Sequence, residues 1–220
     1  MLITAHSGCD ETGKNSMAYL QHACTLQVDA LEIDIRKAGD GRLLLSHDPI
    51  GTDPLVSLED AFTLMAEHSR HDLRINCDLK EYGLEDAVLR TADACGLKRE
   101  SLLFTGSVTD CMHARSQWPD VEIFINAEEL IPGFYEPFLA GRRDTDIFPE
   151  LLKRCREARM QVLNINYRVC PEEVVQLCRK EGIGLSVWTV DDPVEVRRFA
   201  EADVVNLTSN RPQMATEVRG

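Results

Sequence analysis

The strongest constraint on the fold is a regular alternation of short β-like runs with helical patterns along the whole chain. The β-like runs, rich in aliphatic and β-branched residues, cover 2–6, 30–36, 42–47, 73–80, 101–106, 121–127, 162–167, 184–190 and 203–208. The helical patterns cover about 16–27, 57–69, 84–96, 107–117, 148–160, 171–182 and 192–201. Such alternation is typical of parallel β/α units, and roughly eight strands in one domain favour a closed barrel over an open sheet. The sequence therefore predicts an α/β fold, a (β/α)8 TIM barrel forming a single domain over residues 1–220.

One unit departs from strict alternation. The segment RKAGDGR (36–42) joins two β-like runs without an intervening helix. A hairpin is therefore expected there, beside the second strand of the barrel.

Composition and charge narrow the class of partner. The chain has 220 residues, of which 44% are hydrophobic and 28% charged, as is ordinary for a globular domain. No run of about 18 apolar residues occurs, so stable membrane insertion is not expected. The start MLITAHSGCD has no basic segment followed by a long apolar one, which predicts a cytoplasmic protein. A net charge of −13 disfavours binding to nucleic acid or to anionic lipid, whereas a small anionic substrate needs a local positive centre. The oligomeric state is not indicated.

Cysteine usage gives little support for a metal-binding module. The eight cysteines are scattered, without a C-x-x-C pair or a tight Cys/His cluster, so a zinc ribbon or finger is not predicted. Cys9 lies close after His6, but no sequence neighbour suggests a nucleophile. His22 is interpreted as a surface or capping residue.

Polar residues lie within or directly after several predicted strands, where barrels place their chemistry. They are His6, Glu32, Asp34, His47, Asp48, Asp78 and Lys80. Side chains alternate along a strand, so the two acids of LEIDIR (31–36) share one face while its aliphatic residues share the other. Three carboxylates from two strands suit a hard divalent cation, Mg²⁺ or Ca²⁺. The histidines suit general acid and base catalysis, and the lysine suits an anionic group.

Six short motifs occur in order and at plausible spacing. They are HSG (6–8), EID (32–34), HD (47–48), DLK (78–80), WTVDD (188–192) and TSNRP (208–212). In this order the chain resembles the glycerophosphodiester phosphodiesterase family, whose pattern runs H-R-G, E-x-D, H-D, E-x-K, W-T-V-N and T-D-x-P. Asn15 in GKNSM falls where the family has an asparagine. The resemblance extends from residue 3 to residue 212.

The resemblance implies a metal-dependent enzyme that hydrolyses a small-molecule glycerophosphodiester to glycerol 3-phosphate and an alcohol. It implies that the divalent metal is bound by Glu32, Asp34 and Asp78. It implies a catalytic set of His6 and His47, acting as acid and base, with Lys80 on the phosphate. It also implies a substrate-binding set of Trp188, Ser7, Asn15 and Arg36.

Three departures from the family pattern keep alternatives open. Ser7 replaces the arginine of H-R-G, so a bidentate guanidinium contact is lost. Arg36, four residues after Glu32, is a candidate replacement, although a place at the strand rim is the simpler interpretation. Asp78 replaces a glutamate, as in sphingomyelinase D-type phospholipases, which keeps open a transfer that forms a cyclic phosphate. The third departure is the short segment PIGTDPLV (49–56) after H-D, which predicts an open pocket without a lid. A catalytically weak barrel that binds a phosphorylated ligand is the remaining alternative, because of Ser7.

Overall fold

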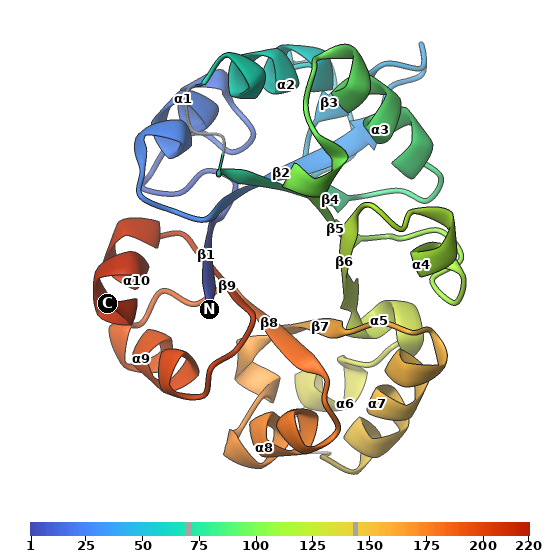
Figure 1. Cartoon of the computed structure of the whole chain (residues 1–220), viewed down its shortest axis with the longest axis vertical. Helices are drawn as coiled ribbons and strands as arrows, with labels where there is room; N and C mark the ends of the chain where they lie inside the picture. The colour runs from blue at the N-terminus through green and yellow to red at the C-terminus, as the bar shows by residue number, and fades with distance from the viewer. Residues whose placement is uncertain (69–71, 143–144) are drawn as a thin grey trace.

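The computed structural model of the chain describes residues 1–68, 72–142 and 145–220. Within these residues, eight parallel strands form one sheet in the order β1-β9-β8-β7-β6-β5-β4-β2, and β1 also pairs with β2. The pairing closes the sheet into a barrel (Figure 1), so the predicted fold class is confirmed. The strands are β1 (Leu2–Ala5), β2 (Ala30–Lys37), β4 (Arg74–Leu79), β5 (Leu102–Gly106), β6 (Glu122–Asn126), β7 (Val162–Asn166), β8 (Gly184–Trp188) and β9 (Asn206–Ser209).

The predicted hairpin is also present. Strand β3 (Leu43–Leu45) runs antiparallel to β2 and lies outside the closed barrel. Gly41, with φ of +92°, supplies the left-handed turn residue that the connection needs. The hairpin ends next to His47, so it carries that histidine to the mouth of the barrel.

Helices surround the barrel as an outer ring (Figure 1). They are α1 (Met17–Thr25), α2 (Leu58–Glu67), α3 (Glu85–Ala94), α4 (Ala114–Gln117), α5 (Ala127–Leu130), α6 (Glu136–Leu139), α7 (Phe148–Glu157), α8 (Glu172–Lys180), α9 (Pro193–Glu201) and α10 (Pro212–Arg219). Short 3-10 turns occur at Arg99–Ser101, Thr145–Ile147 and Tyr167–Val169. No helix among the described residues is long and apolar enough to span a membrane.

The prediction of a helix over 107–117 is mostly wrong. Only its last four residues form α4, because Asp110 has φ of +46° and the buried carboxylate of Glu85 accepts the backbone N–H of Thr109. Both features favour a turn over a continuous helix. The helices α5, α6 and α10 were not predicted, and the predicted end of α2 at residue 69 lies outside the described residues.

The barrel interior is layered. At one end Leu103, Phe124 and Val162 form a small apolar cluster separate from the main core beneath the helices. Further along the strands, buried polar side chains are hydrogen-bonded from strand to strand. Their bonds join Thr4 to Asn206 (2.7 Å), Asn206 to Ser186 (2.9 Å), Ser186 to Asn164 (2.8 Å) and Asn164 to Asn126 (2.8 Å). Because these groups satisfy one another, the barrel can bury them without a large desolvation cost.

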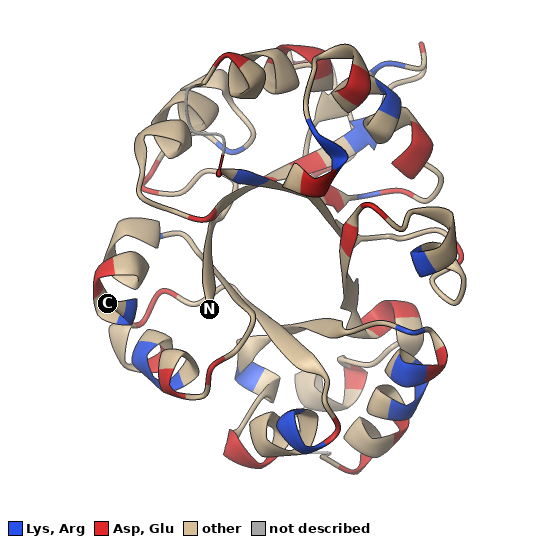
Figure 2. Cartoon of the chain, in the orientation of Figure 1, with Lys and Arg blue, Asp and Glu red and all other residues tan. Residues whose placement is uncertain are grey.

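Charge is distributed unevenly around the barrel. Figure 2 shows charged residues on β2 and β4, whereas β1, β7, β8 and β9 carry none. The mouth therefore has a charged side and an uncharged side that is rich in amides and hydroxyls. Most groups suited to acid–base or metal chemistry lie on the charged side, and Glu128, after β6, adds one carboxylate at this end of the barrel.

Gly106 at the end of β5 provides a test of how tightly the charged side is built. Its φ is +80°, and a Cβ there would lie 2.2 Å from the Leu79 carbonyl oxygen and 2.6 Å from Asp78 Oδ1. We expect Gly106→Ala to lower the free energy of unfolding by about 3 kcal/mol, from backbone strain and steric overlap together. Gly83→Ala is the matched control, with φ of +81° and open space, and it should cost only about 1 kcal/mol. Urea unfolding measures both, and equal losses would contradict the proposed crowding around Asp78.

Candidate active site

A cavity of about 240 Å³ opens at the carboxyl ends of the barrel strands. Its charged side is lined by His6, Glu32, Asp34, Asp78 and Lys80, with His47 at the rim. Its other side includes the uncharged Asn126, Asn164 and Trp188, together with one acid, Glu128. The strands thus bring six of the residues predicted from the sequence to one cavity, together with Trp188.

The three acids converge because β2 and β4 are neighbours in register. Asp34 pairs with Asp78 across the two strands, and Glu32 lies two residues before Asp34 on the same face. One carboxylate oxygen from each acid lies within 4.8 Å of the others. A purely oxygen donor set of this size is what Mg²⁺ and Ca²⁺ prefer, since their bonds to oxygen are about 2.0 to 2.6 Å long.

Lys80 lies between two of these acids. Its Nζ is 2.8 Å from Asp34 Oδ1 and 2.5 Å from Asp78 Oδ2. Burial opposes the charge on Lys80, but the two carboxylates outweigh it and raise the pKa of the ammonium. Lys80 is therefore a fixed positive charge in the lining of the cavity.

Asp34 is the acid with the most hydrogen-bond and ion-pair partners in the cluster. Its Oδ2 accepts hydrogen bonds from Ser7 Oγ (2.8 Å) and Asn15 Nδ2 (2.7 Å), and its N–H donates to Asn15 Oδ1 (3.0 Å). Burial opposes ionisation, but Lys80, Asn15 and Ser7 together lower the pKa of Asp34 below its usual range. Ser7 and Asn15 are buried beside Asp34 and do not line the cavity, so in the structure they position this carboxylate.

Charge is not balanced within the cluster. Burial, followed by the charges of Asp78 and Asp34, raises the pKa of Glu32 well above its usual range. Burial also raises the pKa of Asp78, although Lys80 partly offsets it. Three carboxylates face one ammonium, so full ionisation leaves an excess of negative charge in a buried site. The donor set therefore fits a divalent cation, which would remove this excess.

His6 is oriented by a chain of hydrogen bonds. Asp191 accepts from the backbone N–H and the Nδ2 of Asn210 (2.7 and 2.9 Å), and Asn210 Oδ1 lies 2.8 Å from His6 Nδ1. An ionised carboxylate can only accept, so Asp191 directs the amide oxygen of Asn210 toward His6. Nδ1 then carries the proton, and the lone pair is on Nε2, which lies 3.7 Å from Glu32 Oε1. Burial lowers the pKa of His6, so the neutral ring dominates at neutral pH.

His47 is in a different setting. Its side chain is 53% exposed at the rim, and its Nδ1 lies 2.9 Å from Asp48 Oδ1. Arg36 does not line the cavity, because it donates to the His47 carbonyl oxygen (3.1 and 3.2 Å) and to Glu81 (3.2 Å). These contacts hold the backbone at His47. They use three of the five N–H donors of the guanidinium and hold it outside the cavity lining.

Trp188 lines the uncharged side of the cavity and makes an edge contact with Tyr135, at 6.2 Å between ring centroids. Its Nε1 is buried and has no hydrogen-bond partner among the described residues. The ring thus walls the cavity, where the sequence placed it.

Several residues in or near the cavity were not predicted from the sequence. Asp191 and Asn210 lie inside the two motifs quoted near the end of the chain, but nothing local indicates that they touch. The family pattern has asparagine and aspartate at these positions, so the amide and the acid are exchanged here. Asn126 and Asn164 could have been found as polar residues at alternate positions of apolar strands.

Comparisons with known proteins agree with the resemblance seen in the motifs. A curated glycerophosphodiester phosphodiesterase of Arabidopsis thaliana is 22% identical over 254 residues, covering 97% of this chain and 71% of the relative. A solved glycerophosphodiester phosphodiesterase from Parabacteroides distasonis has a TM-score of 0.77 at 18% identity, covering 99% of this chain and 96% of that one. No family model matches the chain.

A solved Oleispira antarctica phosphodiesterase, in complex with the product sn-glycerol-3-phosphate, has a TM-score of 0.71 at 17% identity. It covers 99% of this chain and 96% of that one. The barrel fold is therefore shared with solved phosphodiesterases. The predicted resemblance to glycerophosphodiester phosphodiesterases is confirmed over essentially the whole chain.

The pKa of His6 tests the contacts proposed for its ring. In chelated protein, we expect NMR titration to give His6 a pKa below the usual value of about 6.5, because burial disfavours the imidazolium. Asn210→Asp should raise that pKa, since a carboxylate beside Nδ1 stabilises the charged ring. The spectrum of His6→Gln assigns the resonance. An unchanged titration in Asn210→Asp would contradict the contact.

Removing the internal ammonium tests the charge balance of the cluster. We expect Lys80→Met to lower the free energy of unfolding by about 3 kcal/mol in chelator, because the buried Asp34 and the half-buried Asp78 lose their cation. Added Mg²⁺ or Ca²⁺ should restore part of this loss. Lys153→Met, at an exposed site on α7, is the control and should change little. A stable Lys80→Met protein that ignores both ions would argue against a cation site.

Proposed function

We propose that the chain is a metal-dependent phosphodiesterase that hydrolyses glycerophosphodiesters to glycerol 3-phosphate and an alcohol. One observation carries the proposal: three carboxylate oxygens of β2 and β4 converge beside the Nε2 atom of His6 at the barrel mouth. The curated relative and the solved neighbours, which are phosphodiesterases by name, support the same reaction class.

Glu32, Asp34 and Asp78 would hold the divalent cation. A bound Mg²⁺ or Ca²⁺ supplies neutralisation of the negative charge that develops on the phosphoryl oxygens. Lys80, which contacts two of the three acids, adds a fixed positive charge on the same side of the cavity. A small phosphodiester can therefore bind a protein whose overall charge is strongly negative.

His6 is the proposed general base. Its proton is held on Nδ1 by Asn210, so Nε2 can accept a proton from the attacking water. A lowered pKa keeps the ring neutral and ready to accept at neutral pH. Because Nε2 faces Glu32, the water it activates would lie next to the acidic cluster.

His47 is the proposed general acid. An alkoxide leaves poorly unless it is protonated, and an imidazolium at the rim can give it that proton. Nδ1 of His47 contacts Asp48 Oδ1, which leaves Nε2 to donate. The exposed position allows the ring to regain a proton from solvent after each turnover.

The uncharged side of the cavity would bind the neutral part of the substrate. Asn126 and Asn164 offer amide groups suited to hydroxyls, and Trp188 offers an apolar wall. The arrangement is compatible with a glycerol group between amides and ring.

Transfer within the substrate to form a cyclic phosphate is the second candidate. Asp78 favours it, since sphingomyelinase D-type phospholipases resemble this chain at that position. The same base and acid would serve, with a substrate hydroxyl in place of water. Phosphorus NMR separates the two reactions, because the cyclic product has its own chemical shift.

Activity on a panel of glycerophosphodiesters, with Mg²⁺ or Ca²⁺ and then with chelator, tests the proposal. We expect metal-dependent alcohol release from at least one member. His6→Gln, His47→Gln and Glu32→Gln should each lower kcat/KM by about 100- to 10,000-fold, since each removes a proton-transfer group or a metal ligand. Asp53→Asn, an exposed carboxylate outside the cavity, should leave the rate unchanged.

Two results would overturn the assignment. One is the absence of metal-dependent release from every member of the panel, which would favour a barrel that only binds a phosphorylated ligand. The other is turnover that survives in Glu32→Gln, because such turnover would belong to a contaminant.

A further inference from the structure

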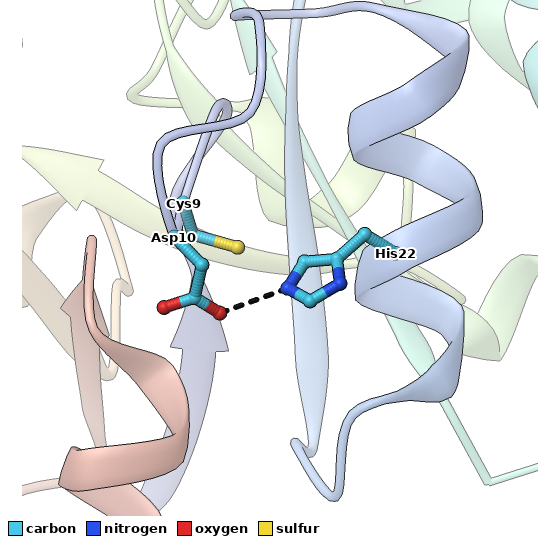
Figure 3. A group of neighbouring side chains, drawn as sticks. All are labelled: Cys9, Asp10 and His22. Carbon is cyan, nitrogen blue, oxygen red and sulfur yellow. Dashed lines mark hydrogen bonds and ion pairs between the residues drawn. The ribbon is translucent and has the colours of Figure 1, made fainter.

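A second group of ligand-type side chains lies outside the cavity. Cys9 and Asp10, in the loop after β1, face His22 on α1 (Figure 3). One ligand atom from each lies within 4.8 Å of the others, and Asp10 Oδ2 is 2.9 Å from His22 Nε2. Among the described residues, this group and the three cavity acids are the two that converge so closely. Sequence patterns did not indicate this group, because Cys9 and Asp10 lie in a loop whereas His22 lies on the helix that follows.

The donor set differs in kind from that of the cavity. It offers sulfur, imidazole nitrogen and carboxylate oxygen, which together suit a borderline-soft ion, whereas Mg²⁺ and Ca²⁺ prefer oxygen alone. Tetrahedral Zn²⁺ has bonds of about 2.0 to 2.3 Å to these atoms. Atoms bound to one such ion are therefore closer to one another than the 4.8 Å limit within which the three ligand atoms lie here. We propose that Cys9, Asp10 and His22 form a zinc-type site, separate from the acidic cluster of the barrel mouth.

The way in is from solvent. Asp10 is exposed and the His22 side chain is 36% exposed, whereas Cys9 is buried. An ion would therefore arrive on the side of Asp10 and His22 and reach the sulfur last. Three protein ligands leave a fourth tetrahedral position for water on the exposed side.

Binding must release protons. Burial, and then the charge of Asp10, raises the pKa of Cys9 to about 12, so the free thiol is protonated at neutral pH. The sulfur becomes a ligand by losing this proton to solvent, which the metal charge makes favourable. His22 Nε2 donates to Asp10 in the free protein, so the neutral ring must carry its proton on Nδ1 once Nε2 binds metal.

The site would fix the loop that leads out of the active centre. The Cys9 N–H donates to the His6 carbonyl oxygen (2.9 Å), and the Asp10 N–H donates to the Asn210 carbonyl oxygen (2.9 Å). An ion between this loop and α1 would therefore brace the backbone beside His6. The role follows from the placement and requires no contact with substrate.

The test uses Co²⁺ as a spectroscopic substitute for zinc in the full-length, reduced chain. We expect a thiolate-to-cobalt charge-transfer absorption that saturates at one ion, accompanied by proton release. Asp78→Asn should keep the band, because oxygen ligands in the cavity do not produce it. His22→Asn and Cys9→Ser should lose it.

Matched controls keep the test decisive. His113 contacts Asp110 at 3.0 Å but belongs to no such three-residue group in the described part of the chain, so His113→Asn should keep the band. Cys95→Ser should keep it too. If Cys9→Ser does not fold, His22→Asn and Asp10→Asn, both altered nearer the surface, decide the question. The absence of a band in the natural chain, or its survival in His22→Asn, overturns the proposal.

Discussion

The repulsion among three carboxylates, two of them buried and one half-buried, dominates the chemistry of this barrel. Glu32, Asp34 and Asp78 lie together because β2 and β4 pair in register, and Lys80 is the cation that forms ion pairs with two of them in the described part of the chain. Burying like charges costs several kcal/mol unless hydrogen bonds, cations or protons compensate. The compensation differs among the acids. Asp34 has Lys80, Ser7 and Asn15 as partners, which lower its pKa, whereas burial and the neighbouring acids raise the pKa of Glu32. A divalent cation would remove the imbalance most directly.

The rest of the barrel lowers the cost of burying polar groups around this acidic cluster. An apolar cluster fills one end of the interior, and a chain of amides and hydroxyls bonds strand to strand above it. Asp191 and Asn210 fix the tautomer of His6 at a distance from the acids. The hydrogen-bonded groups of this chain of amides and hydroxyls satisfy one another, which lowers the cost of burying them.

The sequence predicted the barrel well because its strands are strongly patterned. Every β-like run became a strand, and the hairpin at 36–42 was found from its turn residues. The short helices α5 and α6 were missed because four residues carry too little periodic pattern. The turn at Asp110 was missed because it depends on a tertiary contact with Glu85. The acids could be grouped because parallel strands end at one edge of the sheet.

Roles that depend on side-chain partners were beyond the sequence. The resemblance implies that Ser7 and Asn15 bind substrate, and in the structure both contact Asp34, while Arg36 donates to His47 and Glu81. Ser7 thus has a use even though it cannot act as the arginine of the family pattern. The exchange of acid and amide at positions 191 and 210 also becomes intelligible only when the two side chains are seen in contact.

The central claim is that the acidic cluster binds a divalent cation. Anomalous diffraction from crystals soaked in Mn²⁺ tests it most directly. The account predicts a strong anomalous peak about 2.2 Å from oxygens of Glu32, Asp34 and Asp78, with Lys80 displaced from at least one of the two acids it now contacts. A cluster without a peak, with Lys80 still bridging Asp34 and Asp78 at saturating Mn²⁺, would contradict it.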